Sequence, residues 1–241
     1  MPKLRKVVDP PKQKIKPLDP AVPQPPALVL MVMPCKCGKT TQLSNYFLSN
    51  DFYGQDYFDN VNIISTTINN DTTARFLRQA FDCEDHYEDG MIHKIVSHQK
   101  SFGNVEDMPL IALCIDDCLG EKTTALDNLA SRRRHVNIGL MCVSTQLFRK
   151  VSPTIRANAT NVIIGKLTNE QELEKLSEEY SGMFYDGKNA DANFRRLYGE
   201  ATKKKYETLH LNLQENPAEA WISYHTKIWP KGDTSMLEDD A

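Results

Sequence analysis

The stretch ALVLMVMPCKCGKTTQLSNYFL, residues 27–48, decides the fold. Its first seven residues are all apolar, and a continuous apolar run of this kind predicts a strand that is covered on both faces of a sheet. A short loop follows, and a helical pattern then extends over residues 39–48. A loop between a strand and a helix is a favourable place to bind phosphate, because backbone N–H groups and the positive end of the helix dipole converge there.

The loop matches the second half of the Walker A pattern, G-x-x-x-x-G-K-[ST], through Gly38, Lys39 and Thr40. We expect Lys39 to lie along the β- and γ-phosphates of a nucleotide and the Thr40 hydroxyl to bind Mg²⁺. Met33 stands at the first glycine position. Methionine is strained there if the position needs a positive φ, and it is harmless if the position only ends the strand. The expected nucleotide-binding residues are Pro34, Cys35, Lys36, Cys37, Gly38, Lys39, Thr40 and Thr41.

A second motif, LIALCIDD at residues 110–117, places two carboxylates after an apolar run. This is a Walker B pattern, and ligands of open α/β sheets collect at such carboxyl ends of strands. We expect Asp116 to bind Mg²⁺ and Asp117 to polarise the attacking water. The alternative interpretation is a pair of helix-capping aspartates. Residues 117–120 also fit the D-x-x-G of GTPases, but the chain has no N-K-x-D tetrapeptide, which favours ATP over GTP.

Further apolar runs alternate with helical patterns, which predicts an α/β fold with a parallel sheet covered by helices. One run ends at Gln146, which we expect beside the γ-phosphate, where its amide contacts the attacking water or senses the phosphate. Its alternative role is to cap a loop. After residue 168 the pattern changes to charged helices and alternating runs typical of antiparallel edge strands. The predicted strands are residues 27–33, 61–65, 91–97, 110–115, 136–143, 162–167, 206–213 and 221–229; the predicted helices are 39–48, 71–81, 119–133, 169–180 and 194–204.

The succession GKTT, LIALCIDD, STQ and IRAN (the last at residues 155–158) resembles the HerA–FtsK superfamily of DNA-pumping ATPases. Within it, the chain is most similar to the genome-packaging ATPases of poxviruses, other large eukaryotic DNA viruses and virophages. The resemblance covers about residues 27–167. It implies a P-loop NTPase fold of the ASCE type, with strand order 5-1-4-3-2 and a small C-terminal α/β extension.

The same resemblance implies an ATPase that binds ATP and Mg²⁺ and translocates double-stranded DNA into a capsid as a homo-oligomeric ring. Ring ATPases place an arginine against the γ-phosphate of the neighbouring subunit. Arg156 is the first candidate for this catalytic role, with Arg149 and the cluster at residues 132–134 as rivals. The expected partners also include capsid or portal-vertex proteins. The expected location is the host cytoplasm or a viral factory, or the virion. Two other interpretations remain: a helicase or replication ATPase, and a degenerate P-loop protein that binds DNA or capsid without hydrolysis.

The length and composition of the chain exclude several classes of protein. The chain has 241 residues and a net charge of −3, from 29 basic and 32 acidic side chains. It contains no apolar stretch of about 18 residues, so no membrane span is expected, and its charged start does not resemble a signal peptide. Residues 1–26 hold eight of the 13 prolines and predict a basic extended tail. The expected division continues with an ATPase core at 27–167, a completing segment at 168–230 and an acidic tail at 231–241.

Overall fold

The computed structural model describes residues 16–118, 123–187 and 189–230, and these contain nine strands that form one sheet. The N-terminal 15 residues and the acidic segment 231–241, both predicted as tails, lie outside the described residues. The strands are β1 (Ala27–Val32), β2 (Asn60–Ser65), β3 (Asp82–Glu84), β4 (Ile111–Asp116), β5 (Ile138–Thr145), β6 (Asn161–Ile164), β7 (Leu209–Asn212), β8 (Glu219–Ile222) and β9 (Thr226–Trp229).

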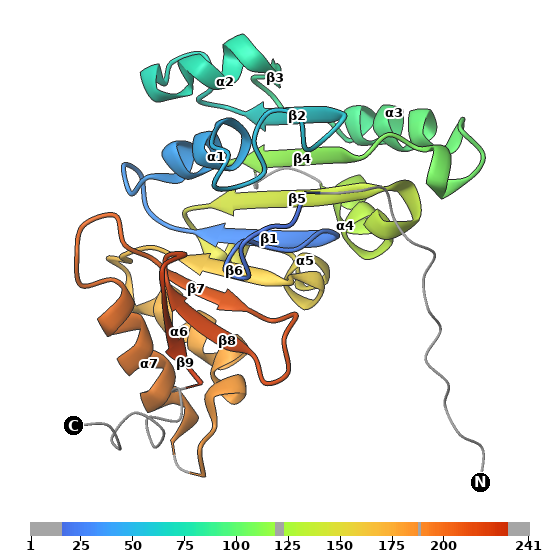
Figure 1. Cartoon of the computed structure of the whole chain (residues 1–241). Coiled ribbons are helices and arrows are strands. Elements are labelled where there is room, and N and C mark those ends of the chain that lie inside the picture. Colours follow the sequence, from blue (N-terminus) through green and yellow to red (C-terminus); the bar gives the residue numbers. More distant parts are fainter. Residues whose placement is uncertain (1–15, 119–122, 188, 231–241) are drawn as a thin grey trace, which may run out of the picture.

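The strand order across the sheet is β3-β2-β4-β5-β1-β6-β7-β8-β9 (Figure 1). All neighbours from β3 to β6 are parallel, whereas the pairs β6–β7, β7–β8 and β8–β9 are antiparallel. The five strands β6-β1-β5-β4-β2 have the predicted order 5-1-4-3-2, so the α/β fold class is confirmed. The antiparallel strands extend the sheet at one edge, as the alternating C-terminal runs predicted.

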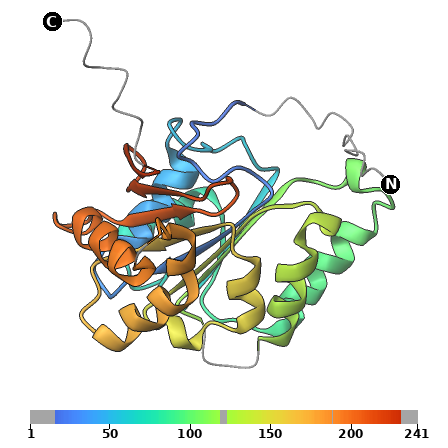
Figure 2. The same cartoon turned by 90° about the horizontal axis from the view of Figure 1, so that it is seen from below.

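Helices cover both faces of the sheet (Figure 2). One face packs against α1 and α2, and the other packs against the remaining α-helices. The helices are α1 (Lys39–Leu48), α2 (Arg75–Ala80), α3 (Asp89–Lys100), α4 (Thr124–Arg132), α5 (Pro153–Asn158), α6 (Glu170–Tyr180) and α7 (Ala190–Ala201); 3₁₀ turns lie at Thr72–Ala74, Val105–Asp107, Arg133–Val136, Phe148–Lys150 and Ser181–Phe184. None of the α-helices in the described part of the chain is long and apolar enough to cross a membrane.

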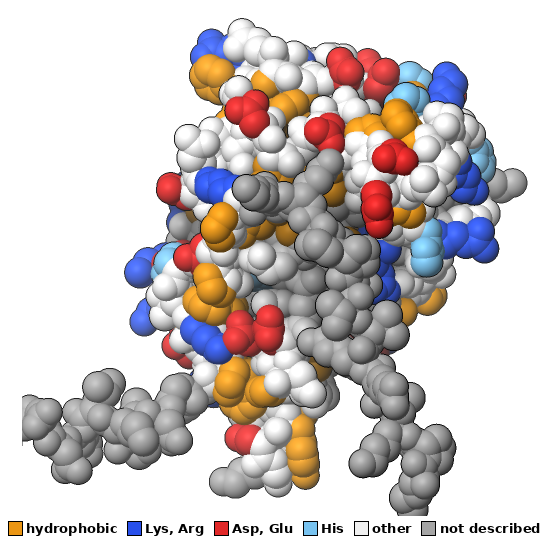
Figure 3. All heavy atoms as spheres, turned by 45° about the vertical axis from the view of Figure 1, so that its right-hand side comes forward, with side chains coloured by type: hydrophobic (Ala, Val, Ile, Leu, Met, Phe, Trp, Pro, Cys, Tyr) orange, Lys and Arg blue, Asp and Glu red, His pale blue; other side chains and the backbone are white. Residues whose placement is uncertain are grey.

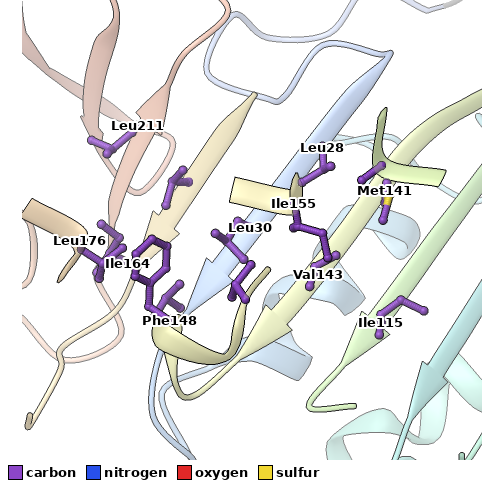
Figure 4. Packing of buried hydrophobic residues seen from close by; sticks show 14 of the residues in the cluster. Leu28, Leu30, Ile115, Met141, Val143, Phe148, Ile155, Ile164, Leu176 and Leu211 are labelled. Atoms are coloured by element: carbon purple, nitrogen blue, oxygen red, sulfur yellow. The ribbon is translucent and has the colours of Figure 1, made fainter. Parts of the chain in front are cut away.

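The continuous apolar run of β1 is explained by this double cover. Side chains alternate across a strand, so Leu28 and Leu30 point to one face while Val29 and Met31 point to the other. Every residue of β1 is fully buried. Figure 4 shows Leu28 and Leu30 together with Ile155 of α5, in the larger of the two apolar layers. A buried central strand of this kind holds the loop that follows it in a fixed position.

Two predicted elements are wrong. Residues 91–97, predicted as a short strand, belong to α3, because Met91, Ile92, Ile95 and Val96 recur with helical spacing and pack against the core on one face. The β-branched side chains of Ile92, Ile95 and Val96 favour a strand locally, but their packing against the core stabilises a helix instead. The run 221–229, predicted as one strand, is instead divided between β8 and β9 by a turn. The short edge strand β3 carries no sequence signal and was not predicted.

The described part of the N-terminal segment packs against the core. Ala21 and Val22 are buried, and Val22 joins the apolar layer around α1. The Tyr53 hydroxyl donates a hydrogen bond of 2.6 Å to the backbone oxygen of Pro23. Residues 21–23 therefore lie against the same layer that supports the phosphate loop.

Candidate nucleotide-binding site

A cavity of about 1040 Å³ opens where the carboxyl ends of β1, β4 and β5 meet the start of α1. Parallel strands expose their ligand-binding side chains at this edge. Most sequence-predicted site residues line it: Cys35, Lys36, Cys37, Gly38, Lys39, Thr40, Thr41, Asp116, Asp117 and Gln146. Pro34 and Arg156 do not line the cavity. The structure thus brings three separate motifs to one place.

The phosphate loop takes its positive φ angles at Lys36 (61°) and Gly38 (98°), and not at Met33. Met33 directly follows β1, and its N–H donates a hydrogen bond of 3.1 Å to the oxygen of Thr145. Of the two alternatives for this position, the structure therefore shows the one in which methionine only ends the strand. The Met33 side chain is fully buried and faces Gly165, where an added Cβ would lie 2.6 Å from the Met33 Cβ. Glycine at position 165 makes room for methionine at position 33.

Lys39 forms an ion pair with Asp117 across the mouth of the loop. The two side chains are 8% and 17% exposed, so this pair is only weakly screened by water. The Gln146 amide donates a hydrogen bond of 3.3 Å to the same Asp117 oxygen. The side chains predicted to contact the γ-phosphate and the attacking water are therefore adjacent. A phosphate that enters the loop can replace Asp117 as the partner of the Lys39 ammonium group.

Asp116 is buried between hydroxyl groups of the two neighbouring strands. The Ser65 hydroxyl on β2 donates a hydrogen bond of 2.9 Å to one carboxylate oxygen, and the Ser144 hydroxyl on β5 donates to the other. Burial raises the pKa of Asp116, and the nearby charge of Asp117 adds to this. A small cavity of about 10 Å³ is lined by Asp116, Ser65 and Thr40 among others. Carboxylate and hydroxyl oxygens in this arrangement match the donors that Mg²⁺ takes in proteins.

Asp71 is a carboxylate of this site that the sequence motifs did not reveal. It lines both cavities and caps a 3₁₀ turn by accepting a hydrogen bond of 2.8 Å from the N–H of Thr73. Burial raises the pKa of Asp71, but hydrogen bonds from Thr40 and Thr73 outweigh this effect and lower it. The only sequence signal was an aspartate at the start of a predicted helix, which is also an ordinary capping residue.

The C-terminal extension contributes a second set of unpredicted residues. The cavity is also lined by Tyr206, Thr208, Ser223 and Tyr224. They reach it because β7 pairs antiparallel to β6, which brings the start of β7 and the β8–β9 turn to the carboxyl end of β6. Nothing in the local sequence indicates this placement. It depends on the pairing register of strands that are distant from the motifs.

The two leading arginine candidates are held by acidic side chains of α6. Arg156 pairs with Glu179 at 2.9 Å, and its guanidinium lies 5.2 Å from the centroid of the Phe148 ring. Arg149 pairs with the buried Glu172 at 2.6 Å. Neither arginine reaches the cavity of its own chain. An arginine that acts on a neighbouring subunit needs to lie outside its own cavity, so the structure leaves this role a prediction for both.

The arginine cluster at 132–134 does not act as one charged surface. Arg133 is buried, donates a hydrogen bond of 2.7 Å to the oxygen of Ala130, and has its pKa lowered to about 10, chiefly by burial. Arg132 and Arg134 are exposed. Only these two can face a polyanion without a change of structure.

Four of the six cysteines lie in the central strands or the phosphate loop. Cys114 and Cys142 are buried in β4 and β5, where they pack as small apolar side chains. Cys35 is exposed and Cys37 is half-buried, both in the phosphate loop. Among the described residues, no three His, Cys, Asp or Glu side chains lie close enough together to hold a metal ion.

Comparison with solved structures places the fold among P-loop ATPases. The genome packaging NTPase B204 of Sulfolobus turreted icosahedral virus 2, in complex with ATPγS, aligns over 80% of this chain and 95% of its own, with 18% identity and a TM-score of 0.55. B204 of Sulfolobus turreted icosahedral virus, a DNA-packaging ATPase, aligns over 82% and 97% with 15% identity and a TM-score of 0.53. The pCW3 conjugation coupling protein TcpA, with ATPγS, aligns over 78% of this chain and 57% of its own, with 14% identity and a TM-score of 0.51.

Sequence comparison adds one viral relative. Uncharacterized protein 075L of Invertebrate iridescent virus 6 is 25% identical in an alignment of 161 residues that covers 64% of this chain and 60% of that protein. No protein-family model matches the chain. The chain has the fold of viral packaging ATPases and of a conjugation coupling protein, so the resemblance that the motifs indicated is matched by its structural neighbours.

Proposed function

We propose that this chain is the ATPase subunit of a motor that translocates double-stranded DNA and packages viral DNA into a capsid. The observation that carries the proposal is the convergence of Lys39, Asp117 and Gln146 at the mouth of a P-loop cavity. The similarity to B204, which spans nearly the whole of that packaging NTPase, supports the choice of DNA packaging among the activities of this fold. On this view residues 27–167 are the ATPase core and residues 168–230 complete it.

The ion pair at the mouth of the loop suggests how nucleotide binding prepares the site. When the γ-phosphate enters, the Lys39 ammonium exchanges Asp117 for phosphate oxygens, because these carry more negative charge. Asp117 is then free to accept a hydrogen bond from the attacking water and so to polarise it. Gln146, already within reach of Asp117, orients the same water. The arrival of the γ-phosphate thus frees the Asp117 carboxylate to act as the base.

The oxygen donors around Asp116 fit a magnesium ion. Thr40 and Asp116 would hold it, and a bound Mg²⁺ neutralises charge on the β- and γ-phosphates. Ser65 and Ser144 keep the Asp116 carboxylate oriented through the hydrogen bonds described above. Thr40, Asp116 and the two serines would therefore act on the ion only through the orientation of its ligands and through charge.

DNA binding needs contacts to the phosphate backbone and no base readout, because a motor must move any sequence. On the described part of the face shown in Figure 3, Lys and Arg side chains are interspersed with Asp and Glu. The proposed contacts are instead local: Arg132, Arg134 and the exposed run Lys203–Lys205. Such binding weakens steeply as salt is raised.

A ring of subunits would let Arg156 or Arg149 act on the γ-phosphate bound by a neighbouring subunit, once the arginine has left its carboxylate partner on α6.

The test is ATP hydrolysis by the full chain, with and without double-stranded DNA. We expect DNA to stimulate turnover, Lys39→Ala to abolish it, and Lys94→Ala, an exposed lysine on α3, to leave it unchanged. Strand separation by the wild-type chain would favour the helicase alternative. Nucleotide and DNA binding without turnover in any variant would refute the motor and support a binding protein.

A further inference from the structure

We infer that the C-terminal extension supplies the base-binding wall of the nucleotide site, with the Tyr206 ring stacking on the nucleobase. This inference rests on the proposed nucleotide binding and deepens it, because the sequence motifs assign only the phosphate end of the cavity. It also gives the extension after residue 168 a direct role in the site.

The first observation is the position of the Tyr206 ring beside the phosphate loop. Tyr206 lines the cavity, and its Cδ1 atom lies 3.8 Å from the place that a Cβ would occupy on Gly38. Even so, the side chain is 61% exposed. A large aromatic ring that lies beside the phosphate loop and is mostly exposed has room for a flat ligand group against it.

The second observation is the backbone of Tyr206, which has a φ of 70°. A bulky residue adopts this left-handed conformation only where surrounding structure imposes it, and such positions concentrate at ligand sites. Here the conformation directs the ring toward the phosphate loop just before β7 begins at Leu209. The Lys205 ammonium lies over the ring, 4.7 Å from its centroid.

The third observation is the chemistry of the cavity as a whole. Its lining combines the polar side chains of Lys39, Thr40 and the two aspartates with the aromatic rings of Tyr206, Tyr224 and Phe52. A triphosphate and a base need these two environments in one cavity. Bases stack on aromatic side chains with little preference among them, because every base has a π-face.

Tyr206 is a better stacking partner than Tyr224. The Tyr224 hydroxyl lies 2.6 Å from that of Tyr46, and its ring packs edge-on against Phe52 with centroids 5.0 Å apart. A third neighbour, His210, has its ring centroid 5.1 Å away. Tyr224 is therefore fixed by side chains on several sides. The Tyr206 ring is the more exposed of the two aromatic surfaces.

The experiment compares two ligands that share the phosphate end of the site. ATP and inorganic tripolyphosphate are titrated into the wild-type chain, Tyr206→Ala, Tyr206→Phe and Tyr185→Ala. Tyr185 is the matched control, because it is 64% exposed and does not line the cavity. We expect Tyr206→Ala to weaken ATP binding about tenfold while tripolyphosphate binding stays unchanged. Tyr206→Phe and Tyr185→Ala should bind both ligands like the wild type.

A second measurement reads the stacking directly. The fluorescence of 2-aminopurine riboside triphosphate should be quenched on the wild-type chain and restored on Tyr206→Ala. Equal ATP affinity in wild type and Tyr206→Ala refutes the inference while leaving the proposed function intact. An equal loss of ATP and tripolyphosphate also refutes it, because Tyr206 would then support the phosphate loop and not the base. Failure of the wild-type chain to bind either ligand overturns the proposed function itself.

Discussion

Gly165→Ala tests whether this glycine is what lets methionine replace the first glycine of the phosphate loop. An alanine Cβ at position 165 would lie 2.6 Å from the Met33 Cβ. Carbon atoms pack at about 3.5–4.0 Å, so the overlap is about 1 Å. Both atoms are bonded directly to the backbone, so neither can rotate away. The ends of β1 and β6 must move apart, although the Gly165 N–H is bonded to the oxygen of Val32 at 3.0 Å.

The expected cost follows from this geometry. Overpacking a buried site lowers the free energy of unfolding by about 1–3 kcal/mol. Gly165 does not have a positive φ, so alanine meets no backbone strain there, and the loss is purely steric. Met33→Ala should not relieve it, because alanine keeps the offending Cβ. Met33→Gly should relieve it, although that change alone costs about 2–5 kcal/mol through the loss of a buried side chain.

The assay is urea unfolding of the nucleotide-free chain, followed by circular dichroism, for each single variant and the two double variants. The matched control is Gly199→Ala in α7, where an added Cβ meets nothing within 4 Å. This control should gain about 0.5–1 kcal/mol, since alanine is the better helix former. If Gly165→Ala costs as much in the Met33→Gly background as in the wild type, the steric account is wrong.

Three further predictions concern titratable and reactive side chains in the site and in the core. Burial lowers the pKa of His210 to about 4. As the pH falls from 6.5 through 4, the unfolded chain therefore binds a proton at His210 that the folded chain does not bind, and the free energy of unfolding falls by about 3 kcal/mol. His210→Gln should flatten this part of a pH–stability curve. Burial raises the pKa of Asp116, so ionisation of this carboxyl group destabilises the fold as the pH rises from 3.8 through the raised pKa. Asp116→Asn should therefore increase the melting temperature at neutral pH. In calorimetry, the same variant should have lost MgATP binding. Alkylation of Cys35 and Cys37 should inhibit ATP hydrolysis, and bound ATP should protect; full activity after complete modification of both thiols would contradict this.

The sequence patterns predicted correctly those features whose physical causes lie within a few adjacent residues. The strand, loop and helix over residues 27–48 were predicted almost to the residue, because an uninterrupted apolar run and a glycine before a helix are local signals. The segment 91–97 was predicted wrongly, because its β-branched residues have a local preference that packing in α3 overrides. The roles of Lys39, Asp117 and Gln146 stay predictions, but their convergence is a feature of the structure.

The sequence by itself determined the class of fold and the phosphate end of the candidate site, since each motif carries its own chemistry within a few adjacent residues. Tertiary structure alone decided the rest. It placed Asp71 beside Thr40, set Gly165 against Met33, and brought Tyr206 to the phosphate loop. These contacts join residues that are tens to more than a hundred positions apart. They depend on strand order and register, which the buried faces of the whole sheet set together and no short segment encodes.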